Sequence, residues 1–204
     1  MIKSLIATIS AAALLALAPH AQAATVVDTG TPDGGAVGAL AFDSVDWVAA
    51  QVSFAQASTI AAIQGHVLGG TAGETFDISL FSADGGAGPG TLMYTTTATF
   101  GDDGWNGVSG LGGWTVAAGT YWIEFEIQGD DTLGARSVTG ALFDTGAPHP
   151  LATTAFTGDA GFSYADAPLS FGLRVSTVPW PSSASLMLAG MALLSTLGLA
   201  RRRR

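Results

Sequence analysis

Residues 120–127 read Thr-Tyr-Trp-Ile-Glu-Phe-Glu-Ile. Apolar and polar side chains alternate in this stretch, and a period of two is typical of a β-strand whose two faces have different surroundings. The alternation turns four side chains toward the protein core: Tyr121, Ile123, Phe125 and Ile127. It turns three the other way, toward solvent or a covering loop: Trp122, Glu124 and Glu126. The stretch therefore predicts a half-buried strand.

Other segments of the chain repeat this alternation. They are Trp47–Phe54, Thr59–Leu68, Thr75–Phe81, Leu92–Phe100 and Phe171–Val175. Turns rich in glycine and aspartate separate many of them, and no long amphipathic helix interrupts the series. Many short strands joined by such turns indicate an all-β protein, built as an antiparallel β-sandwich or jelly roll.

The N-terminus has the three parts of a secretory signal peptide. Lys3 is positive, Leu5–Leu17 is apolar, and the small residues Ala21 and Ala23 occupy the two key positions of a cleavage site. We expect signal peptidase to cut after Ala23, so that the mature chain begins at Ala24. The alternative is an uncleaved anchor, although the apolar segment is short for a membrane span.

The C-terminus predicts a membrane-spanning helix. Residues 182–200 carry no charge, and as a helix they would measure about 28 Å at roughly 1.5 Å per residue. Four arginines follow: Arg201, Arg202, Arg203 and Arg204. By the positive-inside rule this block stays in the cytoplasm, so the preceding domain lies outside the membrane. The span is either a permanent anchor or part of a removable signal.

A short proline motif precedes the span: Val178, Pro179, Trp180 and Pro181. The motif, the span and the terminal arginine block together resemble the PEP-CTERM sorting signal, particularly its VPLPA variant, of exported proteins in Gram-negative bacteria. Trp180 stands where that variant usually has leucine, and Ser182 stands where it usually has alanine. The resemblance implies that an exosortase-type transpeptidase cuts near the motif. The protein would then stay only transiently in the inner membrane before it reaches the cell surface or the medium.

These signals divide the chain into three parts: a signal peptide at 1–23, an ectodomain at 24–176 and a C-terminal sorting signal at 177–204. Within the ectodomain, residues 76–81, 84–92 and 118–122 resemble the extracellular β-sandwiches called choice-of-anchor domains. That resemblance implies a fold and a surface context, and it brings no assigned activity or functional residue.

The ectodomain is strongly acidic. It holds all sixteen acidic residues and only two of the seven basic residues, Arg136 and Arg174, which gives it a formal charge of −14. Such a surface repels nucleic-acid phosphate, so we expect no nucleic-acid partner. Neutral glycans, cations and basic proteins remain plausible partners, and the acidity can also serve solubility alone. The chain has no cysteine, which excludes disulfides and thiolate chemistry.

Residues suited to catalysis are few. Glu124 and Glu126 share a strand face at a spacing that two-carboxylate glycosidases use, although solvent-facing glutamates are far commoner. After removal of the signal peptide only His66 and His149 remain, without a histidine pair at metal spacing, and no Gly-x-Ser-x-Gly motif occurs. We therefore expect a protein that is not an enzyme.

Aspartates on glycine-rich turns offer oxygen ligands for a structural calcium ion, at Asp84, Asp102-Asp103 and Asp130-Asp131. No EF-hand loop or nonapeptide array is present, and solvated turn aspartates explain the same pattern. We therefore assign no cofactor and no metal ligand.

Two tryptophans are candidate glycan contacts. Trp105 lies in the polar segment 103–107, which we expect to be a loop, and Trp122 points away from the core of its strand. An exposed indole offers a flat apolar face on which a sugar ring stacks. The alternative is that both tryptophans are core residues, since a loop can cover the outer face of a sheet.

Three functions from different classes follow. The first is a non-catalytic structural protein of the cell surface or extracellular matrix, sorted through its tail. The alternative is a glycan-binding module associated with extracellular polysaccharide. The third is a secreted glycoside hydrolase, which would need a buried carboxylate pair or a histidine beside a serine in a pocket, and which a deep acidic cleft would favour.

Overall fold

The computed structural model of the chain describes residues 24–34, 38–84, 86–137 and 140–179. Ala23 to Val178 form one compact unit. The predicted cleavage residues Ala21 and Ala23, the second half of the proline motif, the apolar run 182–200 and the arginine block lie outside the described residues. These predictions therefore stay expectations.

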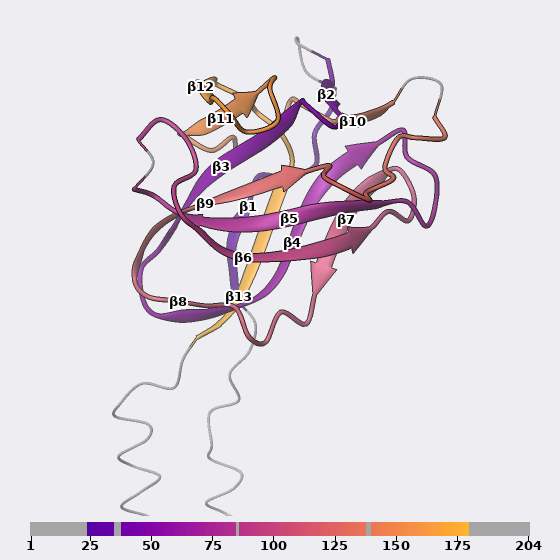
Figure 1. Ribbon diagram of the computed structural model, residues 1–204. Coiled ribbons are helices and arrows are strands. Elements are labelled where there is room, and N and C mark those ends of the chain that lie inside the picture. The colour runs from indigo at the N-terminus through magenta and orange to yellow at the C-terminus, as the bar shows by residue number, and fades with distance from the viewer. Residues whose placement is uncertain (1–23, 35–37, 85, 138–139, 180–204) are drawn as a thin grey trace, which may run out of the picture. The chain divides into compact units, whose positions relative to one another are not determined.

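Within the described ranges the chain forms thirteen strands and no helix (Figure 1). The strands are β1 (Ala24–Asp28), β2 (Leu40–Phe42), β3 (Trp47–Phe54), β4 (Ser58–Leu68), β5 (Thr75–Ser82), β6 (Leu92–Thr99), β7 (Gly104–Ser109), β8 (Thr115–Val116), β9 (Gly119–Glu126), β10 (Ala141–Phe143), β11 (Thr154–Thr157), β12 (Ala165–Asp166) and β13 (Leu173–Pro179). Within these ranges no helix is long and apolar enough to cross a membrane.

The strands make two antiparallel sheets. The first sheet has the order β1-β13-β4-β10-β2, with β7 and β8 also paired to β4. The second sheet has the order β12-β11-β3-β9-β5-β6. This arrangement confirms the predicted all-β class with two antiparallel sheets.

Aromatic side chains fill the space between the two sheets. Phe143 contacts Phe42, Phe125 and Phe171 at ring-centroid distances of 4.8, 4.9 and 5.4 Å. All four rings are buried, and edge-to-face packing of this kind adds to the gain from apolar burial. A Cβ atom on Gly65 of β4 would lie 2.7 Å from the Phe143 ring, so glycine is required where this cluster meets the strand.

The period-two alternation located the long strands well. The predicted segment Trp47–Phe54 coincides with β3, and the predictions for β4, β5 and β6 agree with the structure to within one residue at each end. The short strands β1, β2, β8, β10 and β12 have two to five residues, too few for a periodic pattern to stand out.

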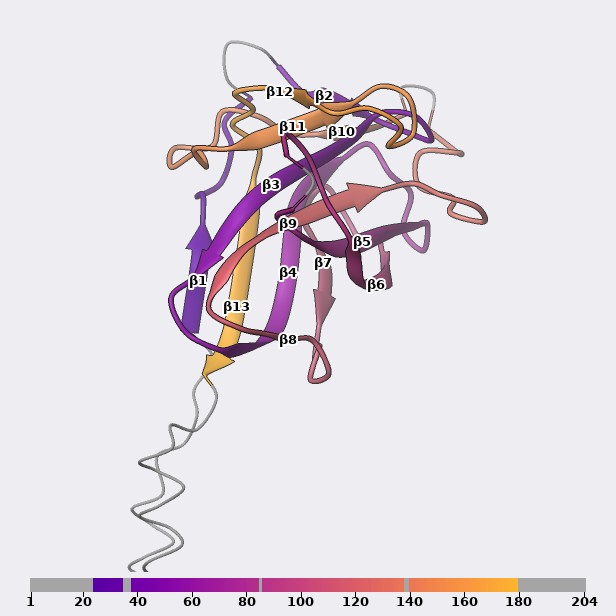
Figure 2. The same ribbon diagram turned by 60° about the vertical axis from the view of Figure 1, so that its left-hand side comes forward.

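The first and last strands lie side by side. β1 pairs antiparallel with β13, and Ala24 is opposite Thr177. Figures 1 and 2 both show the start of β1 and the end of β13 at the same end of the sandwich, with β11 and β12 at the other. The two ends of this compact unit therefore lie at one place.

Candidate functional sites on the two outer sheet faces

The outer face of the second sheet carries the alternate side chains of β9. Trp122, Glu124 and Glu126 are 0%, 0% and 2% exposed, so of the two alternatives for this face, solvent or a covering segment, the structure shows the second. Trp122 forms a second apolar cluster with Ala49 and Ala155. Trp122 as a glycan contact is wrong, because a fully buried indole offers no face to a sugar ring.

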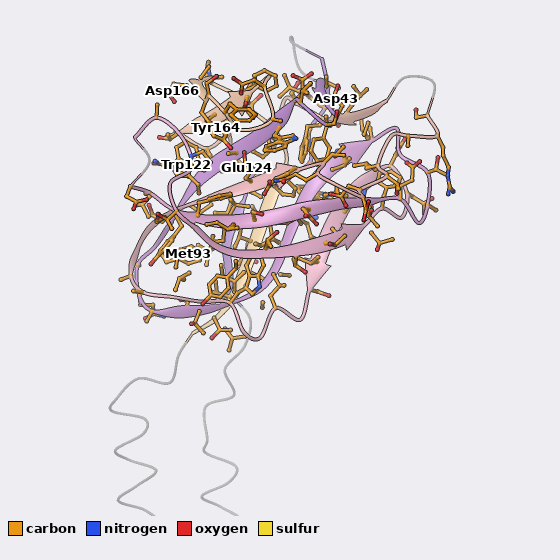
Figure 3. The ribbon with its side chains drawn as sticks, in the orientation of Figure 1. Asp43, Met93, Trp122, Glu124, Tyr164 and Asp166 are labelled. Atoms are coloured by element: carbon orange, nitrogen blue, oxygen red, sulfur yellow. The ribbon has the colours of Figure 1, made fainter. Side chains whose placement is uncertain are left out.

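The cover comes from the segment that follows β11, residues 158–169. Tyr164 of this segment packs against the Trp122 cluster, and Figure 3 shows its side chain beside Trp122 and Glu124. A Cβ atom on Gly161 would lie 2.7 Å from the Trp47 ring, and one on Gly88 would lie 2.6 Å from Tyr164. Glycine at these two positions lets the backbone approach the aromatic rings closely.

Tyr164 also makes a polar contact with the strand beneath it. Its hydroxyl group donates a 2.6 Å hydrogen bond to Oε1 of Glu124. Burial raises the pKa of Glu124 to about 8, with a smaller contribution from the nearby charge of Glu126, while the Tyr164 hydrogen bond acts in the opposite direction. At neutral pH this carboxyl group is therefore mostly protonated and uncharged.

Two further acidic residues lie beside Glu124. Glu126 follows two residues later on the same face, and Asp77 of β5 is directly opposite Glu126 in the register. Burial raises the pKa of Glu126, and the charges of Asp77 and Asp131 raise it further. One oxygen of each residue, Asp77 Oδ1, Glu124 Oε2 and Glu126 Oε1, is buried without a hydrogen-bond partner. We call these three residues the acidic face.

The acidic face resembles a catalytic carboxylate pair in spacing and in burial, and burial is one of the features that the hydrolase hypothesis required. Residues two apart on one strand lie about 7 Å from each other, within the range that glycoside hydrolysis uses. A glycosidase needs an open cleft beside its two acids, whereas Glu124 lies beneath Tyr164 and Glu126 is likewise buried. The geometry suits the storage of a proton in the fold better than attack on a substrate.

Three of the turn aspartates considered as calcium ligands, Asp84, Asp103 and Asp131, accept hydrogen bonds from backbone amides. Asp103 Oδ1 accepts a 2.7 Å hydrogen bond from the Gly69 amide, and Asp131 Oδ2 accepts one of 3.1 Å from the Gln128 amide. Asp84 Oδ1 accepts hydrogen bonds from the Ser82 hydroxyl and the Thr91 amide. Across the described ranges, no three acidic, histidine or cysteine side chains are placed to hold a metal ion.

The outer face of the first sheet carries Trp105. The prediction that Trp105 lies in a loop is wrong, because it belongs to β7 and is opposite His66 of β4. The indole is half-buried, and its ring centroid lies 5.2 Å from that of His66. The guanidinium carbon of Arg174 lies 3.8 Å from the centroid of the indole ring, so Arg174 stacks on Trp105.

A small hollow lies next to this stack. It has a volume of about 130 Å³, and its polar lining consists of Thr25, Asp28, Gln64, Arg174 and Ser176. Arg174 Nε donates a 3.2 Å hydrogen bond to Oδ1 of Asp28, with which it forms an ion pair. We call this feature the Arg174 hollow.

The two histidines of residues 24–176, His66 and His149, make contacts within the fold. His66 is nearly buried, and its Nδ1 lies 3.1 Å from Oδ2 of Asp144. His149 is exposed, and its backbone amide donates a 2.9 Å hydrogen bond to the Thr29 carbonyl oxygen. Among the described residues, neither histidine side chain is hydrogen-bonded to a serine hydroxyl group that it could activate.

Comparisons with known proteins add little to this picture. No protein-family model and no curated protein matches the chain. Among solved structures, the chain is similar to the cysteine protease and lectin-like domains of Cwp84, a surface layer associated protein of Clostridium difficile, with 10% sequence identity and a TM-score of 0.48. The match covers 68% of this chain and 33% of the Cwp84 chain, so this chain spans about a third of the length of the Cwp84 chain.

Proposed function

We propose that the protein is an exported, non-catalytic β-sandwich of the cell surface or extracellular matrix, delivered through its C-terminal signal. The observation that carries this proposal is the pairing of β1 with β13, in which Ala24 lies opposite Thr177. Ala24 is the expected first residue of the mature chain. Thr177 immediately precedes the proline motif.

The paired ends suit a domain that is attached to one membrane twice. Before processing, the signal peptide and the C-terminal span would enter the same membrane from the same side. A domain between two such segments has to bring its ends together, and the β1–β13 pair does so within a single sheet. A domain with its ends on opposite sides would need a long linker, and none separates Thr177 from the motif.

Removal of the tail would also leave the core intact. Leu173 and Val175 are buried core residues of β13, and both precede the motif. Cleavage within or after Val178–Pro181 therefore removes no described side chain of the apolar core. The folded ectodomain would persist after an exosortase-type transpeptidase has acted.

The acidic face supports the non-catalytic part of the proposal. Glu124 is fully buried, hydrogen-bonded to Tyr164 and mostly neutral at pH 7. A secreted glycoside hydrolase would instead have to admit a sugar chain between its two carboxyl groups.

The test is the processing of the tail. In the native exporting cell, we expect the intact mass of the wild-type protein to correspond to a chain that begins at Ala24 and ends near the proline motif. The double variant Pro179→Ala, Pro181→Ala should remain uncleaved in the inner-membrane fraction. Pro168→Ala, a change at an exposed loop proline, is the matched control and should be processed normally. A wild-type chain that keeps residues 182–204 and stays membrane-bound would instead establish a permanent anchor.

A further inference from the structure

We propose that the Arg174 hollow is a binding subsite for a neutral sugar unit of a polysaccharide. This inference does not depend on how the tail is processed, because the hollow is formed by strands β1, β4 and β13 of the folded ectodomain. Its residues were not identified as a site from the sequence. Only the neighbouring Trp105 was.

The hollow is held in place by regular backbone pairing. Asp28 and Thr25 of β1 are opposite Arg174 and Ser176 of β13, and Gln64 lies on the adjacent strand β4. Side chains supported by three hydrogen-bonded strands need little rearrangement to meet a ligand, which lowers the entropic cost of binding.

Trp105 fixes the orientation of the guanidinium group. Because Arg174 stacks on the indole and its Nε is bound to Asp28, the plane of the group is determined by two contacts. The remaining N–H donors of Arg174 have no acceptor among the described residues. Trp105 is thus a positioning residue, and Arg174 is the group that meets the ligand.

The lining matches the chemistry of hydroxyl groups. Arg174 supplies donors, Asp28 supplies a carboxylate acceptor, and Gln64, Thr25 and Ser176 each supply both kinds of group. A sugar hydroxyl donates one hydrogen bond and accepts others, so it can use donors and acceptors that lie side by side. A volume of about 130 Å³ leaves room for several water molecules, and so for the edge of one sugar ring.

The charge around the hollow favours a neutral over an anionic ligand. The Gly30 amide and, to a smaller degree, Arg174 lower the pKa of Asp28, so Asp28 is ionised at neutral pH and already balances the charge of Arg174. The ectodomain as a whole has a formal charge of −14. The site therefore offers a uronate or sulfate group no net positive charge, and the acidic domain as a whole repels such a group.

One such subsite binds a sugar unit weakly, and many copies of the subsite on one surface compensate for the low affinity. A single sugar edge held by a few hydrogen bonds gives an affinity in about the millimolar range. Many copies of the protein on one surface, facing a repetitive polymer, raise the effective affinity without any new contact. This is the behaviour expected of a matrix component.

Affinity gel electrophoresis of the purified full-length mature protein tests the proposal, with galactomannan and dextran as neutral probes and alginate as the anionic probe. We expect retardation by at least one neutral polymer. Arg174→Ala and Gln64→Ala should each weaken it about tenfold, which corresponds to the loss of roughly 1.4 kcal/mol of binding free energy. Arg136→Ala removes the other ectodomain arginine and should have no effect.

Thermal melting of each variant ensures that the comparison is made on folded protein. Gln64→Ala keeps the Arg174–Asp28 ion pair and so tests the hollow even if Arg174→Ala fails to fold. The proposal is overturned if neither neutral polymer retards the wild type. Retardation by alginate alone, or retardation that both folded variants retain, would overturn it as well.

Discussion

The Tyr164 hydroxyl group lies 2.6 Å from Oε1 of Glu124 and donates a hydrogen bond to it, although the two residues are separated by forty positions in the chain. This bond attaches residues 158–169 to the outer face of the second sheet. It also closes over a carboxyl group that is wholly buried. The outer face of β9 is thereby part of the folded interior, and the protonation of Glu124 contributes to protein stability.

Glu124 should make the protein less stable as the pH rises. Its pKa is about 8 in the folded state, against an ordinary value of 4.5, so the folded state holds this proton more tightly than the unfolded state. The stabilising contribution is complete below about pH 4.5 and is lost as the pH rises toward 8. The free energy of unfolding should fall by up to about 1.4 kcal/mol per pH unit in this window.

Urea denaturation between about pH 5 and pH 9 measures this effect. Glu124→Gln mimics the protonated acid and should show a smaller slope of stability against pH, with a gain over the wild type that increases toward alkaline pH. Asp166→Asn changes an exposed acid and should leave the slope unchanged. Identical slopes for the wild type and Glu124→Gln would mean that Glu124 does not bind a proton in this range.

Tyr164→Phe removes the hydroxyl group and keeps the ring that covers Trp122. We expect a loss of about 1 to 2 kcal/mol in the free energy of unfolding, because a buried acceptor on Glu124 loses its donor. The pKa of Glu124 should rise further, since the Tyr164 hydrogen bond lowers it in the wild type. Denaturation curves at several pH values report both changes. Phe162→Ala, which alters a 91% exposed neighbour, is the control and should change neither.

The two tryptophans should respond differently to substitution. Trp122→Ala removes a fully buried side chain and should lower the free energy of unfolding by about 3 to 5 kcal/mol. Trp105→Ala removes a half-buried ring on the other sheet and should cost less stability. It should still reduce retardation by a neutral polysaccharide, because Arg174 loses the surface on which it stacks. Chemical denaturation and affinity electrophoresis separate the two effects, and equal stability losses would contradict the assignment.

The sequence could not show that Trp122 is buried and that Trp105 is only half-buried. The alternation through β9 correctly separated Ile123 and Phe125 from Trp122 and Glu124. It could not show that the second face is also covered, because the cover is an irregular segment with no periodic pattern of its own. The position of the partly buried Tyr164 over Trp122 depends on pairing between β11 and β3, and such long-range contacts leave no local signal.

The sequence places Trp105 in a loop, but it lies in a strand. Glycines at 104 and 107 favour a loop when the sequence is read locally. In the structure Gly107 is part of β7, and a Cβ atom there would collide with the carbonyl oxygen of Ile63 on the partner strand β4. Glycine at this position permits close strand pairing and does not end the strand. The contact of Arg174 with Trp105 follows from that pairing, so the Arg174 hollow could not be found from spacing.

Glu74 should make the protein less stable as the pH falls below about 4.5. Its carboxylate is 1% exposed and accepts hydrogen bonds from the backbone amides of Thr71, Gly134 and Arg136 at 2.8, 2.9 and 3.0 Å. Burial alone would raise its pKa, but the three amide hydrogen bonds outweigh burial and lower the pKa below 4.5. The contribution of Glu74 is therefore present above about pH 4.5 and is lost as the pH falls through the lower folded-state value.

Glu74→Gln should lower the free energy of unfolding at pH 6 by roughly 3 kcal/mol, because an amide group cannot accept all three hydrogen bonds. The loss should shrink as the pH falls below about 4.5 and through the lower folded-state pKa of Glu74, where the wild type also gives up its charge. Acid and urea titrations of the wild type, Glu74→Gln and Glu124→Gln would then define a stability maximum at mildly acidic pH, with Glu74 limiting it on the acid side and Glu124 on the alkaline side. A Glu74→Gln protein as stable as the wild type at pH 6 would show that the loop at residues 132–137 does not depend on this carboxylate.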